Sequence, residues 1–164
     1  MLKFSSKLRI ALIVGGLGLS IVPISQAADS PEQIAKALVT KYAALKNAKD
    51  LTKMSEIYAD GYLERSGRNP SGIAAVTLNW QQQFVAMPDI QVTVHDVIAS
   101  GDKVVARVTY SATHTTPFFA GIAPTGKTIS LGTIDIWRIE NGKFAEHWDQ
   151  VDFAGLQRQL TAKP

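Results

Sequence analysis

Apolar residues follow two different periods along this chain, and the change of period predicts helices first and strands afterwards. Between about residues 30 and 85, apolar side chains recur every three or four positions, the spacing of an amphipathic helix. From Ile90 onward, apolar and polar residues alternate with a period of two, as in a β-strand. Helices followed by a run of long antiparallel strands predict an α+β fold.

Capping and breaking residues predict where each element begins and ends. Asp29 or Ser30 can cap a first helix, and Pro31 is tolerated in its first turn because the amide proton that it lacks would have no partner there. Gly61 ends the second helix, and a Pro-Asp pair ends the third. The expected helices cover about 30–45, 51–58 and 73–85, with a closing helical turn at 153–160. The expected strands cover about 62–66, 90–99, 104–115, 127–139 and 144–151.

The turn between the last two strands allows two registers. A two-residue Asn141-Gly142 loop would pair Glu140 with Lys143. A three-residue loop, with Gly142 as a bulge at positive φ, would pair Ile139 with Lys143. The two registers differ by one residue, and such a shift changes which side chains share a face.

This choice decides whether the polar residues of the two strands meet. The two-residue loop places Asp135 opposite Trp148. The three-residue loop places Asp135 opposite His147 and Thr133 opposite Asp149, so that two carboxylates, an imidazole and a hydroxyl share one face. We expect the three-residue loop.

The first 27 residues have the pattern of a secretory signal peptide. Three basic residues precede the uncharged stretch from Ile10 to Val22, which is shorter than the roughly 20 residues of a membrane-spanning helix. Ser25 and Ala27 are small residues that suit a signal-peptidase site, and an uncleaved membrane anchor is the alternative. We expect a signal peptide over 1–27, a single domain over 28–164, and a periplasmic or secreted protein without membrane association after cleavage.

Composition and charge exclude several classes of protein. The chain has 164 residues, of which 46% are hydrophobic and 19% charged, a globular composition. Three of the 17 basic residues lie in the first nine positions, so the rest of the chain carries equal numbers of basic and acidic residues; nucleic-acid binding is not expected. The absence of cysteine excludes disulfides and thiolate sites. A zinc site is not expected, because the three histidines lack ligand spacing.

The stretch from Trp80 to Leu160 resembles the SnoaL-like polyketide cyclases, also called ester cyclases, of the nuclear transport factor 2-like superfamily. The resemblance lies in the order and spacing of several short motifs: Met87-Pro-Asp89, Ala99-Ser-Gly-Asp-Lys-Val-Val105, Ala112-Thr-His114, Phe119-Ala-Gly-Ile-Ala-Pro-Thr-Gly-Lys127, Asp135-Ile-Trp-Arg-Ile-Glu-Asn-Gly-Lys143, Glu146-His-Trp-Asp149, and Asp152 before Leu156-Gln-Arg-Gln-Leu160. It implies a cone-shaped α+β barrel in which three N-terminal helices pack on a curved antiparallel sheet. It also implies a possible homodimer.

The same resemblance implies a chemistry and a set of site residues. Cyclases of this family close a ring by intramolecular aldol condensation, without metal, other cofactor or Schiff base, and an aspartate near the end of the last strands acts as acid and base. That role falls here on Asp149, with Asp135 and His147 as catalytic neighbours. A non-catalytic module that binds a small hydrophobic ligand in the same cavity is the alternative function, and a structural pairing with Arg138 is the alternative role of Asp135.

A more distant resemblance is to ketosteroid isomerase. It implies that Asp135 and Tyr42 would form an oxyanion hole, but Ser66 stands where that enzyme has its general-base aspartate. A serine cannot serve as that base unaided, so Glu64, Asp149 and His147 are the nearest alternatives. The side chains expected to contact the ligand are Tyr42, Glu64, Trp80, Phe84, His114, Phe119 and Thr133.

Overall fold

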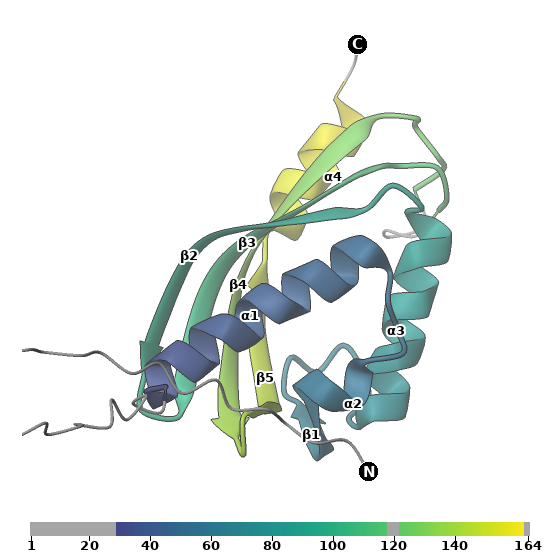
Figure 1. The fold of residues 1–164 in the computed structure, drawn as a ribbon. Coiled ribbons are helices and arrows are strands. Elements are labelled where there is room, and N and C mark those ends of the chain that lie inside the picture. The colour runs from purple at the N-terminus through teal and green to yellow at the C-terminus, as the bar shows by residue number, and fades with distance from the viewer. Residues whose placement is uncertain (1–28, 118–121, 163–164) are drawn as a thin grey trace, which may run out of the picture.

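A five-stranded sheet forms one side of the molecule, and the long first helix lies against its curved inner face (Figure 1). The computed structural model describes residues 29–117 and 122–162. The strand order is β1-β5-β4-β3-β2, and β1 pairs with β5 in parallel, whereas all other neighbours are antiparallel. The strands are β1 (Tyr58–Glu64), β2 (Gln91–Ser100), β3 (Lys103–Thr113), β4 (Thr128–Glu140) and β5 (Lys143–Val151). The cone-shaped α+β arrangement that the resemblance implies is confirmed.

The long first helix, α1 (Pro31–Ala48), crosses the inner face of the sheet (Figure 1). Ser30 caps it through a reciprocal pair of bonds with Gln33, and Lys49 ends it in the left-handed conformation. The other helices are α2 (Met54–Ile57), α3 (Ile73–Ala86) and α4 (Phe153–Thr161). α3 stands beside the open edge of the cone, and α4 follows β5 and packs at the far end of β4 (Figure 1).

Most predicted elements are present, and the main difference in their bounds lies at the junction of α2 and β1. The expected helix over 51–58 is reduced to one turn, α2, and the expected strand over 62–66 begins four residues earlier, at Tyr58. The physical reason is parallel pairing of β1 with β5, which draws Tyr58 opposite Phe144. The expected signal peptide lies outside the described residues. Within them, no helix has the length and apolar character needed to cross a membrane.

The expected register of the last hairpin turn is wrong, but Asp135, His147 and Asp149 still share one face of the sheet, as expected. Glu140 pairs with Lys143, and Asn141 and Gly142 both have positive φ, so the turn is the two-residue loop. The register then shifts at Ala145, an extra residue in β5 that has no partner in β4. This bulge lies in the strand and not in the turn.

The bulge at Ala145 brings the acidic residues opposite one another. Beyond it Trp137 pairs with His147 and Asp135 pairs with Asp149. An unbroken ladder from the same turn would have placed Trp148 opposite Asp135, with His147 and Asp149 on the outer face. The extra residue therefore restores the shared face that the three-residue loop had been expected to supply.

Candidate functional site

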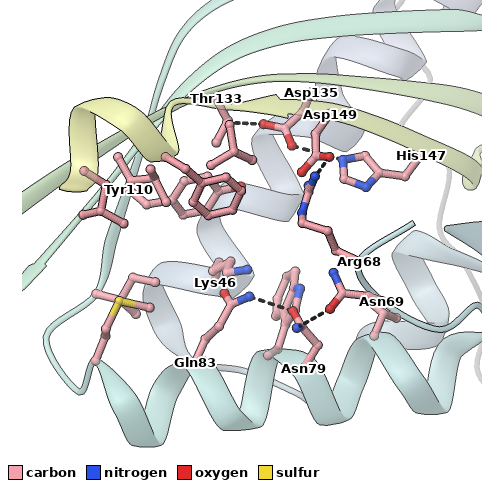
Figure 2. Close-up of a pocket in the computed structure, with 18 of the residues that line it drawn as sticks. Lys46, Arg68, Asn69, Asn79, Gln83, Tyr110, Thr133, Asp135, His147 and Asp149 are labelled. Atoms are coloured by element: carbon pink, nitrogen blue, oxygen red, sulfur yellow. Dashed lines mark hydrogen bonds and ion pairs between the residues drawn. The ribbon is translucent and has the colours of Figure 1, made fainter. Parts of the chain in front are cut away.

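A cavity of about 510 Å³ lies between the inner face of the sheet and the helices. Residues of α1, α3 and α4 line it together with residues of four of the five strands, β1, β3, β4 and β5. Much of the lining is apolar, and its aliphatic side chains include Ile90, Ile129, Leu131, Leu156 and Leu160. Figure 2 shows that polar side chains gather at one side of this space, where β4 and β5 run next to each other.

A chain of hydrogen bonds joins Glu64, His147 and Asp135 at the polar side of the cavity. His147 Nδ1 donates to Glu64 Oε2 over 2.9 Å, and its Nε2 donates to Asp135 Oδ1 over 3.0 Å. The Thr133 hydroxyl donates to the other oxygen of Asp135. The His147 ring also stacks on Trp137, with ring centroids 5.2 Å apart. Because two carboxylates accept from one imidazole, the geometry fits a doubly protonated His147.

The pKa values of this chain agree with that assignment. Burial by itself lowers the pKa of His147, but the hydrogen bonds and charges of Asp135 and Glu64 outweigh burial and raise it to about 9. Burial raises the pKa of Glu64, but the bonds from His147 and Ser66 and the charge of His147 outweigh it and lower the value to about 2. At neutral pH the imidazole is therefore positive and Glu64 negative.

Asp149 lies directly opposite Asp135 across the strand pair and faces the same cavity. Its carboxylate forms an ion pair with Arg68, which reaches in from the loop after β1 (Figure 2). The Asp149 side chain is 11% exposed, whereas that of Arg68 is 38% exposed, so the carboxylate is largely shielded from water and the guanidinium is not. Arg68 and His147 thus place two positive charges beside two neighbouring carboxylates, which offsets their mutual repulsion.

Lys46 of α1 provides a third cationic side chain in the lining. Only 3% of the residue is exposed, and its Nζ lies 4.5 Å from the centre of the Trp80 ring and 5.3 Å from that of Tyr110. Burial lowers its pKa to about 7, although the charge of Asp135 acts in the opposite direction. Beside it the hydroxyls of Tyr42 and Tyr110 are hydrogen-bonded over 2.6 Å.

The structure brings together most of the side chains expected in the site. Six line the cavity beside Asp149, namely Tyr42, Glu64, Trp80, Thr133, Asp135 and His147. Phe84 is outside the lining and packs against buried residues of the core, and His114 is buried outside it, with Nδ1 bonded to Thr125. Phe119 lies outside the described residues. Arg138 is not a partner of Asp135, because it pairs with Glu140 and Glu146.

Sequence reasoning missed several residues of the site. Arg68 was not among the expected site residues, but it lines the cavity and pairs with Asp149. Lys46 was overlooked, although a lysine one helical turn after Tyr42, on the buried stripe of the first helix, was a usable signal. Three amides also line the cavity and are joined by hydrogen bonds, Asn79 and Gln83 of α3 and Asn69 of the loop before it (Figure 2).

Asp135, His147 and Asp149 also have the residue types of a metal site. Each offers one ligand atom, and these atoms lie within 4.8 Å of one another. The His147 imidazolium and the Arg68 guanidinium already neutralise these carboxylates. A divalent cation would have to displace a proton from His147 and compete with Arg68. The group is therefore better suited to proton transfer than to metal binding.

Comparison with known proteins places the fold and the family. The model of the SnoaL-like polyketide cyclase family matches residues 36–160. TsrD from Streptomyces laurentii is 32% identical, with a TM-score of 0.73 over 79% of this chain and 96% of that one. AclR from Streptomyces galilaeus, described as a putative hydroxylase, is 30% identical, with a TM-score of 0.67 over 79% of this chain and 85% of that one.

A third solved structure, of IdmH from Streptomyces antibioticus, carries the name of a putative polyketide cyclase. It is 24% identical, with a TM-score of 0.69 over 79% of this chain and 99% of that one, and it supports the fold. Among curated proteins none is significantly similar to the chain. The family model covers residues 36–160, which is most of the chain. The chain therefore belongs to the SnoaL-like polyketide cyclase family.

Proposed function

We propose that this protein catalyses cofactor-free acid–base chemistry on a small hydrophobic carbonyl compound, with aldol ring closure as the reaction. Family membership supports a cyclase-type function. The observation that carries the finer proposal is the placement of Asp149, Asp135 and His147 at one side of a largely apolar cavity. A carboxylate in such surroundings can take a proton from carbon without competition from bulk water.

Asp149 is the proposed base. It takes a proton from the carbon next to a carbonyl group, and the electron pair of that C–H bond moves to the carbonyl oxygen to form an enolate. The enolate carbon then bonds to a second carbonyl carbon of the same molecule. The proton passes from Asp149 to the new alkoxide oxygen, so the carboxylate is restored and no external reactant is consumed.

Positive groups beside Asp149 are placed to stabilise the developing negative charge. The Arg68 guanidinium contacts Asp149, and the His147 imidazolium is held by Asp135 and Glu64. Because these groups are fixed before substrate arrives, stabilising the enolate would require little reorganisation. Glu64 is a positioning residue in this scheme, since it touches His147 and orients its ring.

Exchange of carbon-bound protons tests the proposal without knowledge of the natural substrate. β-Tetralone, a bicyclic ketone with acidic protons, is incubated with the protein in D₂O, and deuterium uptake is followed by NMR. We expect the wild type to accelerate exchange, and Asp149→Asn to lower that acceleration by roughly 10²-fold, the usual scale for loss of a general base.

A matched control distinguishes the base from a general effect of charge. Asp96→Asn removes a carboxylate from an exposed ion pair with Arg107 and should leave exchange unchanged. Full exchange activity in Asp149→Asn would show that Asp149 is not the base. Absence of acceleration in the wild type, despite binding of the ketone, would favour the non-catalytic binding module.

A further inference from the structure

Lys46 presents a buried ammonium group to the cavity without an acidic partner. The residue is only 3% exposed and lines the cavity from α1. Within the described part of the chain, its Nζ has no carboxylate at ion-pair distance and makes no hydrogen bond. Its contacts are instead the rings of Trp80, Tyr110 and Tyr42, whose centres lie 4.5, 5.3 and 5.6 Å from Nζ.

The three rings stabilise the positive charge but leave its hydrogen-bond donors unused. The face of an aromatic ring attracts a cation electrostatically, and tryptophan does so best. A lysine ammonium has three N–H donors, however, and a buried donor without an acceptor costs free energy. Because lysine is almost never fully buried unless it is paired, the arrangement at Lys46 is suited to a partner that enters the cavity.

The other two cations beside the proposed base already have acidic partners. Each of the three carboxylates at the polar side of the cavity contacts either Arg68 or His147. Lys46 contacts none of the three, and Asp135 acts on it only through space, by a charge that raises the pKa of the lysine. An anion that enters the cavity would therefore find at Lys46 a cation that no acid of the described residues occupies.

Lys46 and the proton-transfer groups lie on different walls of the cavity. The helix α1 carries Lys46, whereas β4 and β5 carry Asp149 and its polar neighbours (Figure 2). Much of the remaining lining is aliphatic or aromatic. A ligand that uses both walls would have an apolar body with a carbonyl group at one place and an acidic group at another.

We propose that Lys46 binds a carboxylate group carried by the ligand of this cavity. The inference deepens the proposed function, on which it rests, because it narrows the substrate to a hydrophobic carbonyl compound that also bears a carboxylic acid. The carboxylate supplies the acceptor that the ammonium lacks, in a charge-assisted hydrogen bond. A single ammonium among apolar rings suits such a monoanion, whereas a phosphate carries up to two charges and three strong acceptor oxygens and needs more donors.

Two aromatic probes of similar shape and different charge test the proposal. Naphthalene-2-carboxylate and the neutral naphthalene-2-carboxamide are titrated into the purified protein at pH 6 by isothermal titration calorimetry. Burial lowers the pKa of Lys46 to about 7, so the amine is mostly protonated at this pH. We expect the carboxylate to bind about tenfold more tightly than the amide or better, the scale of one charge-assisted hydrogen bond. Equal affinities in the wild type would overturn the proposal.

Two variants assign the preference to Lys46. Lys46→Met keeps a long side chain and removes the charge, and Lys36→Met makes the same change at an exposed position of the same helix. We expect Lys46→Met to bind the two probes equally and Lys36→Met to keep the preference of the wild type. An undiminished preference in Lys46→Met would contradict the assignment.

A crystal structure of the wild type with naphthalene-2-carboxylate provides a measurement that does not depend on any variant. The carboxylate should lie at hydrogen-bond distance from Lys46 Nζ. A carboxylate bound instead to Arg68 would overturn the proposal.

This proposal and the proposed function fail in different ways, because binding of the probes requires no proton transfer. A preference that depends on Lys46, in a protein that accelerates no deuterium exchange, would support the carboxylate site and contradict the assigned base. Exchange that depends on Asp149, with equal affinities for the two probes, would support the proposed function and contradict the carboxylate site.

Discussion

His147 illustrates how single contacts set the charge of this site. A histidine with an ordinary pKa of 6.5 would be largely neutral at pH 7, but two carboxylates hold this one in the charged form up to a pKa of about 9. The same contact lowers the pKa of Glu64 to about 2. The chain Glu64–His147–Asp135 is therefore a fixed arrangement of charges in a cavity that would otherwise favour neutral groups.

This arrangement makes the stability of the protein depend on pH. Because the folded pKa of His147 is raised, its contribution is fully present below about pH 6.5 and is lost as pH rises through about 9. We expect the free energy of unfolding to fall over that window by on the order of 3 kcal/mol. Denaturant unfolding at a series of pH values measures this change.

Glu64→Gln should weaken that dependence, since the glutamine removes one of the two charges that hold the proton on His147. NMR titration should then show a lower pKa for the imidazole, and the decrease in stability should begin at a lower pH. An unchanged His147 titration in this variant would contradict the assigned network. Glu56→Gln is the control, because Glu56 forms an exposed ion pair with Lys41.

At the scale of elements, the hairpin between β4 and β5 determines which residues face the cavity. A two-residue turn alone would have directed His147 and Asp149 away from Asp135, and the extra residue Ala145 corrects the face. The parallel pairing of β1 with β5 adds Glu64, which lies opposite His147. Three strands thus contribute one side chain each to the hydrogen-bonded chain.

The turn itself should depend on Gly142. Its φ is +71°, a conformation that costs an L-residue about 1 kcal/mol or more. An added Cβ would meet only Ile34 Cγ2 at 3.9 Å, an ordinary contact, so the cost would come from the backbone. We expect Gly142→Ala to lower the free energy of unfolding by about 1 kcal/mol, measured by denaturant unfolding.

Gly132 supplies the matched control for this prediction. It lies in β4 without positive φ, and an added Cβ would meet no atom within 4 Å. Gly132→Ala should leave stability unchanged or increase it. Equal losses in both variants would show that the conformation of Gly142 is not the cause.

At the scale of the whole molecule, a cone closed by α1, α3 and α4 holds polar groups in a largely apolar space (Figure 1). We propose that this domain acts outside the cytoplasm, after removal of residues 1–27. Protein recovered from a producing cell should then begin at Ala28 on N-terminal sequencing. A chain that began at Met1 would contradict cleavage and favour the anchor.

The sequence by itself determined the class of fold and the identity of the family. Apolar periodicity reports which side of an element is buried, and that signal is local; it was strong enough to predict α1, α3 and all four long strands to within a few residues. The motifs around Asp135 and Asp149 were sufficient for the family, and they marked the two strands on which the site is built.

Only the tertiary structure decided how the site is assembled. The bulge at Ala145 depends on how β5 fits between β4 and β1, and no residue of the turn predicts it. Arg68 and Lys46 enter the cavity from a loop and a helix that are distant in sequence from the strands. Their roles follow from burial and neighbouring charge, which arise only when the sheet curves over α1 and excludes water from the space between them.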